Sequence, residues 1–353
     1  MQSNTSDKIQ PFFFNALKAK VDHYFSENRL ERTGEVKLYL KGGIQILSAV
    51  LIYCTLVFIN PPLWLSLPLA VLLGVNLAVL GFNIMHEGGH QSFSKYRWLN
   101  SVAAYFLNAL GGTTHFWKIK HNINHHTFTN IAGIDSDINV GPFMRLHPNQ
   151  PKFPAHRYQH LYWFLLYGVS YIAWVFYEDF VKYFTKKIVA NMAPKSLPVR
   201  ERVVFWTTKA WYVLIYLGLP IFMLGWIKAL IGFLIVTFVC GLFMSVVFQL
   251  AHVVEVTDFP VTSKIETEWA LHQVSTTSNF GTSNKTLFWL LGGLNFQVEH
   301  HLFPRISHIH YPQISRLVKE TCQEFNIAYH EYSSMAKALV SHLLYLRKMG
   351  LSN

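Results

Sequence analysis

Residues 43–90 read GIQILSAVLIYCTLVFINPPLWLSLPLAVLLGVNLAVLGFNIMHEGGH. This stretch contains two apolar runs, residues 43–60 and 62–85, and each is close to the ~20 residues that an α-helix needs to cross a bilayer. The NPP turn at residues 60–62 is too short to hold a domain outside a membrane. The stretch therefore predicts a transmembrane hairpin that leads directly into a motif with two histidines.

A second pair of apolar runs, residues 210–227 and 229–251, meets at the short GWIK turn of residues 225–228. Across the 353 residues, 51% are hydrophobic and 14% are charged, a balance typical of membrane proteins. We therefore expect an all-α integral membrane protein with four transmembrane helices in two hairpins. The first residues, MQSNTSDKIQPFFFN, do not resemble a removable signal peptide, and three widely spaced cysteines suggest no disulfide framework.

Lysine and arginine counts predict which side of the membrane each loop occupies. Seven lie before residue 43, thirteen between residues 86 and 204, and eight after residue 255, whereas the two hairpin turns contain only Lys228. Because basic loops stay in the cytosol, both termini and the central loop are expected on the cytosolic side. Two weaker apolar segments, residues 98–112 and 161–177, are interrupted by polar residues, and we expect them to lie along the membrane interface.

These expectations divide one membrane domain, residues 1–353, into five segments. They are a cytosolic helical segment (1–42), the first hairpin (43–85), a cytosolic cap with interfacial helices (86–209), the second hairpin (210–251), and further cap and C-terminal helices (252–353). The net charge of +11 suits anionic lipid headgroups or acidic soluble partners, and we expect no nucleic-acid partner.

Eight of the 18 histidines are expected at this cytosolic face. Three motifs, HEGGH, HNINHH and QVEHH, and the end of the fourth crossing supply them: His86, His90, His121, His125, His126, His252, His300 and His301. Eight imidazoles are too many for one metal ion and suit two, and imidazole is a ligand for Zn, Cu, Fe and Ni. The cap is therefore expected to hold a di-metal site. Seven histidines are interpreted as structural, and His272 is the closest of them to inclusion: His115, His147, His156, His160, His272, His308 and His310.

Two other functions fit part of this pattern. HEGGH matches the H-E-x-x-H helix of zinc proteases, in which the glutamate is the general base, so an intramembrane zinc protease is one alternative. A membrane haem protein that carries electrons also uses histidines in spanning helices. The protease leaves HNINHH and QVEHH without a role. Haem ligands usually lie one per helix, at opposing depths, and not as adjacent HH pairs.

Taken in order, HEGGH, WKIKHNINHHTFTNIAGIDSDI and FQVEHHLFPRISHIHYP resemble the histidine boxes of the membrane fatty acid desaturases. Gln297, which begins the third box, makes the chain similar to the front-end subgroup. The resemblance implies four crossings under a cytosolic cap, two irons held by the eight histidines, and O2 as co-substrate. It implies no catalytic side-chain acid or base. The His-Pro-Gly-Gly motif of a fused cytochrome domain does not occur, so electrons are expected from a separate ferredoxin or b-type cytochrome.

The implied reaction places a cis double bond in a fatty acyl chain carried on CoA, a carrier protein or a lipid. Side-chain acids and bases cannot remove hydrogens from unactivated methylenes, so an oxidising metal centre is required. Histidine-box hydroxylases of alkyl, sterol or carotenoid substrates remain an alternative. Four polar residues near the boxes are candidates for contacts with the ligand imidazoles: Gln297, Glu255, Asp135 and Asp137.

Overall fold

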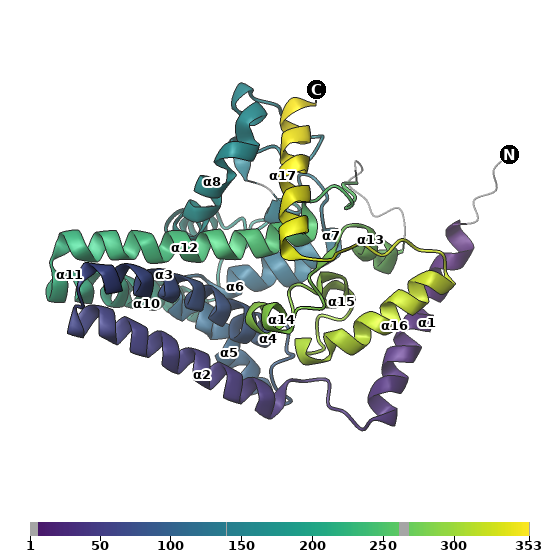
Figure 1. Ribbon diagram of the computed structural model, residues 1–353, viewed down its shortest axis with the longest axis horizontal. Helices are drawn as coiled ribbons and strands as arrows, with labels where there is room; N and C mark the ends of the chain where they lie inside the picture. Colours follow the sequence, from purple (N-terminus) through teal and green to yellow (C-terminus); the bar gives the residue numbers. More distant parts are fainter. Residues whose placement is uncertain (1–5, 139, 261–267, 353) are drawn as a thin grey trace. The chain divides into compact units, whose positions relative to one another are not determined.

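The computed structural model describes residues 6–138, 140–260 and 268–352, and most of them are helical. The chain forms two compact units. Unit 1 contains Met1–Gly34, His121–Leu161 and Val247–Asn353, and unit 2 contains Glu35–Lys120 and Tyr162–Val246. The chain therefore passes between the units four times (Figure 1).

Unit 2 is built from long apolar helices, several of which contain a π-helical turn. In chain order they are α2–η1 (Glu35–Cys54, Thr55–Ile59), α3–η2–α4 (Leu63–Leu80, Gly81–Met85, His86–Gly89), α5 (Arg97–Ala109), α6 (Thr114–Trp117), α8–η7–α9 (Gln159–Ala173, Trp174–Glu178, Asp179–Thr185), α10–η8–α11 (Val199–Val213, Leu214–Gly218, Leu219–Leu224) and α12 (Trp226–His252). The first residues of α8 and the last of α12 belong to unit 1.

Five helices in the described ranges are long and apolar enough to cross a membrane. Four of them overlap the predicted crossings: Glu35–Ile59, Leu63–Gly89, Val199–Leu224 and Trp226–His252. The third ends at Leu224, three residues before the predicted end at 227. The fifth, Pro154–Thr185, includes residues 161–177, which we expected at the interface. Residues 98–112 fall largely on α5, whose 13 residues rise only about 20 Å. The chain is a multi-pass membrane protein, and helix length alone raises the number of possible crossings from four to five.

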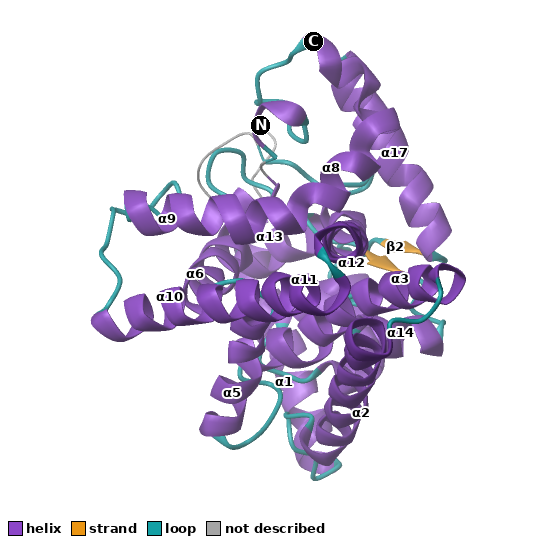
Figure 2. Cartoon of the chain, turned by 90° about the vertical axis from the view of Figure 1, so that its left-hand side faces the viewer, coloured by secondary structure: helices purple, strands orange, loops and turns teal. Residues whose placement is uncertain are grey.

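Close packing joins the helices of unit 2. A Cβ added to Gly74 of α3 would lie 2.6 Å from the carbonyl oxygen of Val236 on α12, so only glycine permits this approach. Figures 1 and 2 show α8 running steeply across α12. At that crossing, a Cβ on Gly168 would lie 2.1 Å from the Phe238 ring. The contact of α8 with α12 therefore also depends on a glycine.

Unit 1 consists of shorter helices and one pair of strands. They are α1 (Ser6–Glu27), the end of the π-helix η3 (Lys118–His125), α7 (His126–Phe128), the 3-10 turns η4 (Ser136–Ile138), η5 (Gly141–Phe143), η6 (Pro154–Tyr158) and η9 (His308–His310), α13 (Trp269–Ser275), β1 (Asn279–Phe280), α14 (Lys285–Leu291), α15 (Gln297–Leu302), α16 (Tyr311–Glu324), β2 (Glu331–Tyr332) and α17 (Met335–Leu351). β1 and β2 are parallel, with Asn279 opposite Glu331. Side chains of α1, α13, α15 and α16 form its hydrophobic core.

The two units do not follow the five expected segments. Residues 86–120 and 162–209, which we expected in the cap, belong largely to unit 2 with the apolar helices. Residues 1–34 of the expected N-terminal segment belong to unit 1. Unit 1 therefore contains six of the eight candidate histidines, and unit 2 contains His86 and His90.

Candidate metal centre

The first histidine motif continues the long helix that begins at Leu63. The π-helical turn Gly81–Met85 leads into α4, which carries His86, and His90 caps α4. The two imidazole centroids are 4.6 Å apart, and each ring packs edge-on against Trp117, at 5.8 Å and 5.7 Å. Both histidines are buried. The i, i+4 spacing thus gives a side-by-side pair, as the sequence predicts.

The two glycines of HEGGH are required by close contacts. A Cβ on Gly88 would lie 2.5 Å from the Cβ of Ala103, and a Cβ on Gly89 would lie 2.2 Å from the Trp117 ring. Glu87 is also buried, and its carboxylate accepts a hydrogen bond of 2.7 Å from the Ser92 hydroxyl. These contacts give Glu87 a structural partner, whereas the protease interpretation requires a general base.

The second motif lies on a π-helix, a form that often occurs at functional sites. The rings of His121 and His125 stack with centroids 5.2 Å apart. His125 Nδ1 lies 2.9 Å from a carboxylate oxygen of Asp135, and His121 Nδ1 lies 3.3 Å from Asp137. Asp135 also accepts from the backbone N–H groups of Asn130 and Asp137, so the carboxylate itself is held in place. The expected contacts of Asp135 and Asp137 with imidazoles are therefore present.

The third motif forms α15, which begins at Gln297. Its two adjacent histidines are tied to different neighbours through Nδ1. His301 Nδ1 donates to Gln273 Oε1 on α13 at 2.7 Å, and His300 Nδ1 lies 3.1 Å from the hydroxyl of Tyr311. The Thr129 hydroxyl also lies within hydrogen-bond distance of Gln273 Oε1, at 2.9 Å.

In unit 1, the histidines of the second motif, of the third motif and of the end of α12 converge. Ring nitrogens of His125, His252 and His301 lie within 4.8 Å of one another, and all three residues are fully buried. His126 stacks on His301 with centroids 4.4 Å apart. His121 stacks on His300 at 6.2 Å. The six histidines of unit 1 thus form one buried cluster, although residues 126 and 252 lie far apart in the sequence.

This cluster fits a transition-metal site. In four of its histidines, Nδ1 faces an acceptor or a hydroxyl, which leaves Nε2 as the ligand atom, the arrangement common around protein-bound metals. Burial lowers the pKa of His121 more than the Asp137 hydrogen bond raises it. The imidazole is therefore neutral at pH 7, as a ligand must be. Neutral nitrogen donors suit Fe, Zn, Cu or Ni better than Mg or Ca.

The two remaining expected partners behave differently. The amide nitrogen of Gln297 lies 3.0 Å from His252 Nε2, so Gln297 contacts a candidate ligand directly. Glu255 is exposed, and its carboxylate accepts a hydrogen bond from Ser341 of α17 at 3.4 Å. Within the described part of the chain, Glu255 makes no hydrogen bond with a candidate ligand imidazole. The hydrogen bond to Ser341 removes the reason for assigning Glu255 to the metal site.

Sequence reasoning missed the residues that hold the third motif. Gln273 carries no motif signal, because its partner His301 is 28 positions away. Glu299, between Gln297 and the two histidines, is buried and accepts hydrogen bonds from Asn279 of β1 at 2.7 Å and from Tyr329 at 2.8 Å. Burial raises the pKa of Glu299. This carboxyl group therefore fastens α15 to the strand pair.

Two of the histidines interpreted as structural bond to the backbone through both ring nitrogens. His147 bonds to Pro260 O at 3.1 Å and to the N–H of Asn149 at 3.0 Å. His156 bonds to Pro142 O at 2.9 Å and to the N–H of Phe153 at 3.1 Å. Their structural role is confirmed by these contacts. His272 is buried on α13, and burial lowers its pKa.

Comparison with known proteins identifies the family. The model of the fatty acid desaturase family matches residues 62–333, which include every candidate histidine. The chain belongs to the fatty acid desaturase family. It is thus a fatty acid desaturase, an oxidoreductase, and the zinc protease and haem interpretations of its histidines are set aside.

Three curated desaturases are similar over 96% of this chain. The sn-1 linoleoyl-lipid 6-desaturase of Arthrospira platensis is 34% identical, with 93% of its length covered. The sn-1 linoleoyl-lipid 6-desaturase of Synechocystis sp. is 32% identical, with 95% covered. The acyl-lipid (8-3)-desaturase of Physcomitrium patens is 33% identical, with 72% covered. All three are named as desaturases of lipid-linked acyl chains, and none is named as a hydroxylase.

Proposed function

We propose that this desaturase is a front-end, di-iron enzyme that acts on a lipid-linked, already unsaturated acyl chain at the cytosolic face of a membrane. The proposed iron ligands are the seven histidines of the three boxes and His252: His86, His90, His121, His125, His126, His252, His300 and His301. The proposal treats residues 1–353 as one functional domain, since the family match includes segments of both units.

The observation that carries the iron proposal is the set of polar partners at Nδ1. Asp135, Asp137, Gln273 and Tyr311 each hold the Nδ1 side of a different buried histidine. Such partners fix the tautomer and the orientation of a ligand imidazole before a metal arrives. A cluster that only filled a core would not need four rings oriented through Nδ1.

Bound iron supplies the activation of O2 that lets two hydrogens leave adjacent methylenes. The balance is one –CH2–CH2– unit, one O2, two electrons and two protons converted to one –CH=CH– unit and two waters. The side chains bind and orient the reactants. Because the cluster is buried, it also keeps bulk water away from a strongly oxidising reaction.

Gln297 occupies a special position in this scheme. Its amide group contacts His252, so it can orient that imidazole or a water beside it. Asp135 and Asp137 orient their histidines through Nδ1, and no side chain is assigned as a catalytic acid or base. Electrons come from a separate carrier, and ferredoxin or a b-type cytochrome fits a chain with a net charge of +11 because both carriers present acidic surfaces to basic partners.

We infer four crossings, with both termini and the histidines on the cytosolic side. The charge distribution supports this topology, because the 13 basic residues between positions 86 and 204 favour the cytosol. The steep crossing of α8 over α12 supports an interfacial position for residues 161–177 (Figure 1). The topology is tested by labelling single cysteines, introduced at residue 61 or 190, in sealed vesicles. Four crossings predict that the two sites are labelled from opposite sides of the membrane.

Product analysis tests the reaction. The chain is expressed with a ferredoxin and its reductase in a host whose lipids contain linoleoyl chains, and acyl chains are profiled by mass spectrometry with location of the double bonds. We expect an additional double bond on the carboxyl side of the existing ones, first in lipid-linked chains and later in the CoA pool. Recovery of hydroxylated chains alone would refute desaturation. If the new double bond appeared in the CoA pool before the lipid pool, the lipid-linked substrate would be refuted.

Metal analysis of a matched pair of variants tests the site. Protein produced in iron-supplemented medium should contain about two irons per chain, since eight imidazoles suit two metal ions. His301→Ala should lose iron and activity while it keeps its helical content. The exposed His23 on α1 provides the control, because His23→Ala removes an imidazole outside the cluster. An active His301→Ala variant with full iron content would remove His301 from the ligand set.

A further inference from the structure

An apolar crevice lies within unit 2, at the end of its helices that carries the two short turns. It is lined by α3, by the first half of α12, and by residues of the helices that precede the turns at 60–62 and 225–228, among them Tyr53 and Tyr216. Its volume is about 340 Å³, which is within the range of small-molecule sites. His86 and His90 lie at the opposite end of the helix that begins at Leu63. The hairpin crevice, as we call it, is therefore separate from the histidine motifs.

The walls of the hairpin crevice are largely apolar. Ala70, Leu73 and Leu77 follow one face of α3 at helical spacing, and Ala229, Gly232 and Val236 follow one face of α12. A Cβ added to Gly232 would meet no atom within 4 Å, so the glycine leaves real space between the helices. Because both helices are long and apolar enough to span a membrane, lipid chains are the molecules that surround this opening.

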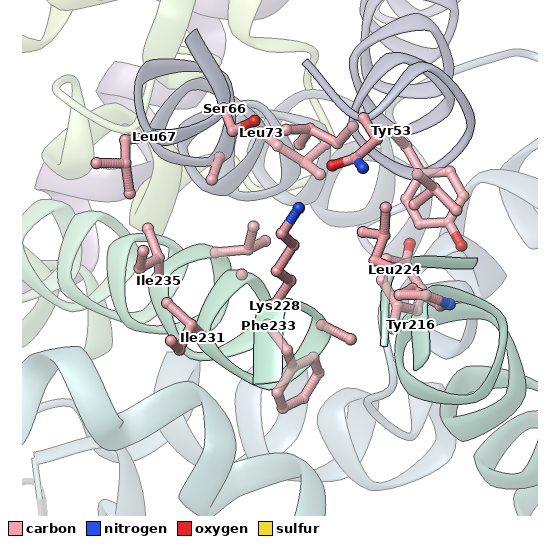
Figure 3. A pocket seen from close by; sticks show the side chains of 18 of the residues that line it. Tyr53, Ser66, Leu67, Leu73, Tyr216, Leu224, Lys228, Ile231, Phe233 and Ile235 are labelled. Atoms are coloured by element: carbon pink, nitrogen blue, oxygen red, sulfur yellow. The ribbon is translucent and has the colours of Figure 1, made fainter. Parts of the chain in front are cut away.

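Lys228 is the charged residue among those that line the crevice. Lys228 is exposed, and Figure 3 shows its side chain extending across the crevice, with the ammonium nitrogen between the two helix pairs. The segments that supply the lining, residues 36–86 and 202–254, contain no Asp or Glu. The charge of Lys228 therefore has no carboxylate partner from its surroundings, and an anionic group from outside the chain would complement it.

Two tryptophans indicate the depth of Lys228 in the membrane. Trp64 and Trp226, next to the two turns, are 74% and 66% exposed. Exposed tryptophans at the ends of spanning helices prefer the level of the lipid headgroups. Lys228 lies two residues from Trp226, so its ammonium group is at the height of a lipid phosphate, while the rest of the crevice reaches into the acyl region.

We propose that the hairpin crevice binds an anionic phospholipid of the leaflet opposite the histidines, with its phosphate on Lys228 and one acyl chain against the apolar residues that line the crevice. This lipid is a resident of the protein and is distinct from the substrate. The inference depends on these helices spanning a bilayer and does not depend on the iron chemistry.

Lipid retention by the full-length chain tests this site. The protein is reconstituted into nanodiscs of equal parts phosphatidylglycerol and phosphatidylcholine, extracted in mild detergent, and analysed by native mass spectrometry. Wild type should retain about one phosphatidylglycerol per chain in preference to phosphatidylcholine. Lys228→Gln should weaken that preference about fivefold, the equivalent of ~1 kcal/mol per basic residue at a lipid surface. Lys228→Arg should restore it.

A second variant separates binding from folding. Gly232→Leu fills the crevice, and it should abolish retention while improving the helix propensity of α12. Gly43→Leu is its matched control, because Gly43 is an exposed helical glycine of α2 whose Cβ also meets open space, and it does not line the crevice. Equal retention of phosphatidylglycerol by wild type, Lys228→Gln and Gly232→Leu would overturn the proposal. The proposal would also be overturned if Gly232→Leu retained lipid normally but desaturated shorter acyl chains than wild type. That result would assign the crevice to the tail of the substrate.

Discussion

Gln273 provides a sharp test of how the metal site is organised. Its Oε1 atom accepts a hydrogen bond from His301 Nδ1 at 2.7 Å, and both residues are buried. Gln273→Leu keeps the approximate size of the side chain and removes this acceptor. The hydroxyl of Thr129, at 3.4 Å from His301 Nδ1, is too far away to replace it as an acceptor of similar strength.

The size of the effect follows from the two hydrogen bonds. Thr129 loses little, because its hydroxyl also donates to the backbone oxygen of His125 at 2.7 Å. The buried N–H of His301 loses its good acceptor, which costs about 1–3 kcal/mol. Since 1.4 kcal/mol is tenfold at 25 °C, and lost partners of ligand imidazoles typically reduce metal affinity 10–100-fold, we expect metal binding to weaken at least about tenfold.

The assay is titration of the metal-free enzyme with Co²⁺, followed by its visible absorption, together with turnover of an acyl-lipid substrate. Gln273→Glu should restore most of the affinity, because it retains an oxygen acceptor for His301. Gln313→Leu makes the same chemical change at an exposed position of α16 and should have no effect. Wild-type cobalt affinity and spectrum in Gln273→Leu would refute the idea that this glutamine orients a ligand.

Three further predictions concern stability. Burial lowers the pKa of His342 to about 4, so acidification from pH 7.5 to pH 5 protonates this imidazole in the unfolded chain before the folded one and should cost about 2 kcal/mol. His342→Phe should therefore lose about 2 kcal/mol less stability than wild type over the same pH range in thermal unfolding. Gly89→Ala should destabilise the chain by about 1–3 kcal/mol in denaturant titrations, because its Cβ would lie 2.2 Å from the Trp117 ring. Alanine at the open helical position Gly43 should instead stabilise it by up to about 1 kcal/mol. Lys209→Met should lower the free energy of unfolding by about 3–5 kcal/mol, because it leaves Asp179 buried without its 2.9 Å ion pair. Adding Asp179→Asn should recover part of the lost denaturation midpoint.

The crossings and the histidine boxes could be read from local patterns. An apolar run of about 20 residues has one stable form in a bilayer, since every backbone group must be hydrogen-bonded within the segment. The four predicted crossings accordingly overlap helices that are long enough to span a membrane. The length of the helix Pro154–Thr185 was harder to predict, because Gly168 and several tyrosines lower the hydropathy of this segment. Neither feature prevents a long helix.

The contacts of the boxes were less accessible to sequence reasoning. Asp135 and Asp137 were predicted because they follow HNINHH closely in the chain. Glu255 had equal proximity to His252, but the turn after α12 directs its carboxylate to Ser341 of α17, 86 residues away. Short separation in the chain therefore limits where a side chain can reach without determining where it points.

By itself, the sequence determined that this protein enters a membrane and carries three histidine motifs, because hydropathy and i, i+4 spacing are local properties. Only the tertiary structure decided how the histidines of unit 1 are used. It stacked His126 on His301, brought His125 to His252, and selected Gln273 and Tyr311 to hold their neighbours. The physical reason is that imidazole orientation depends on hydrogen bonds between distant segments, and those bonds exist only after the helices have packed.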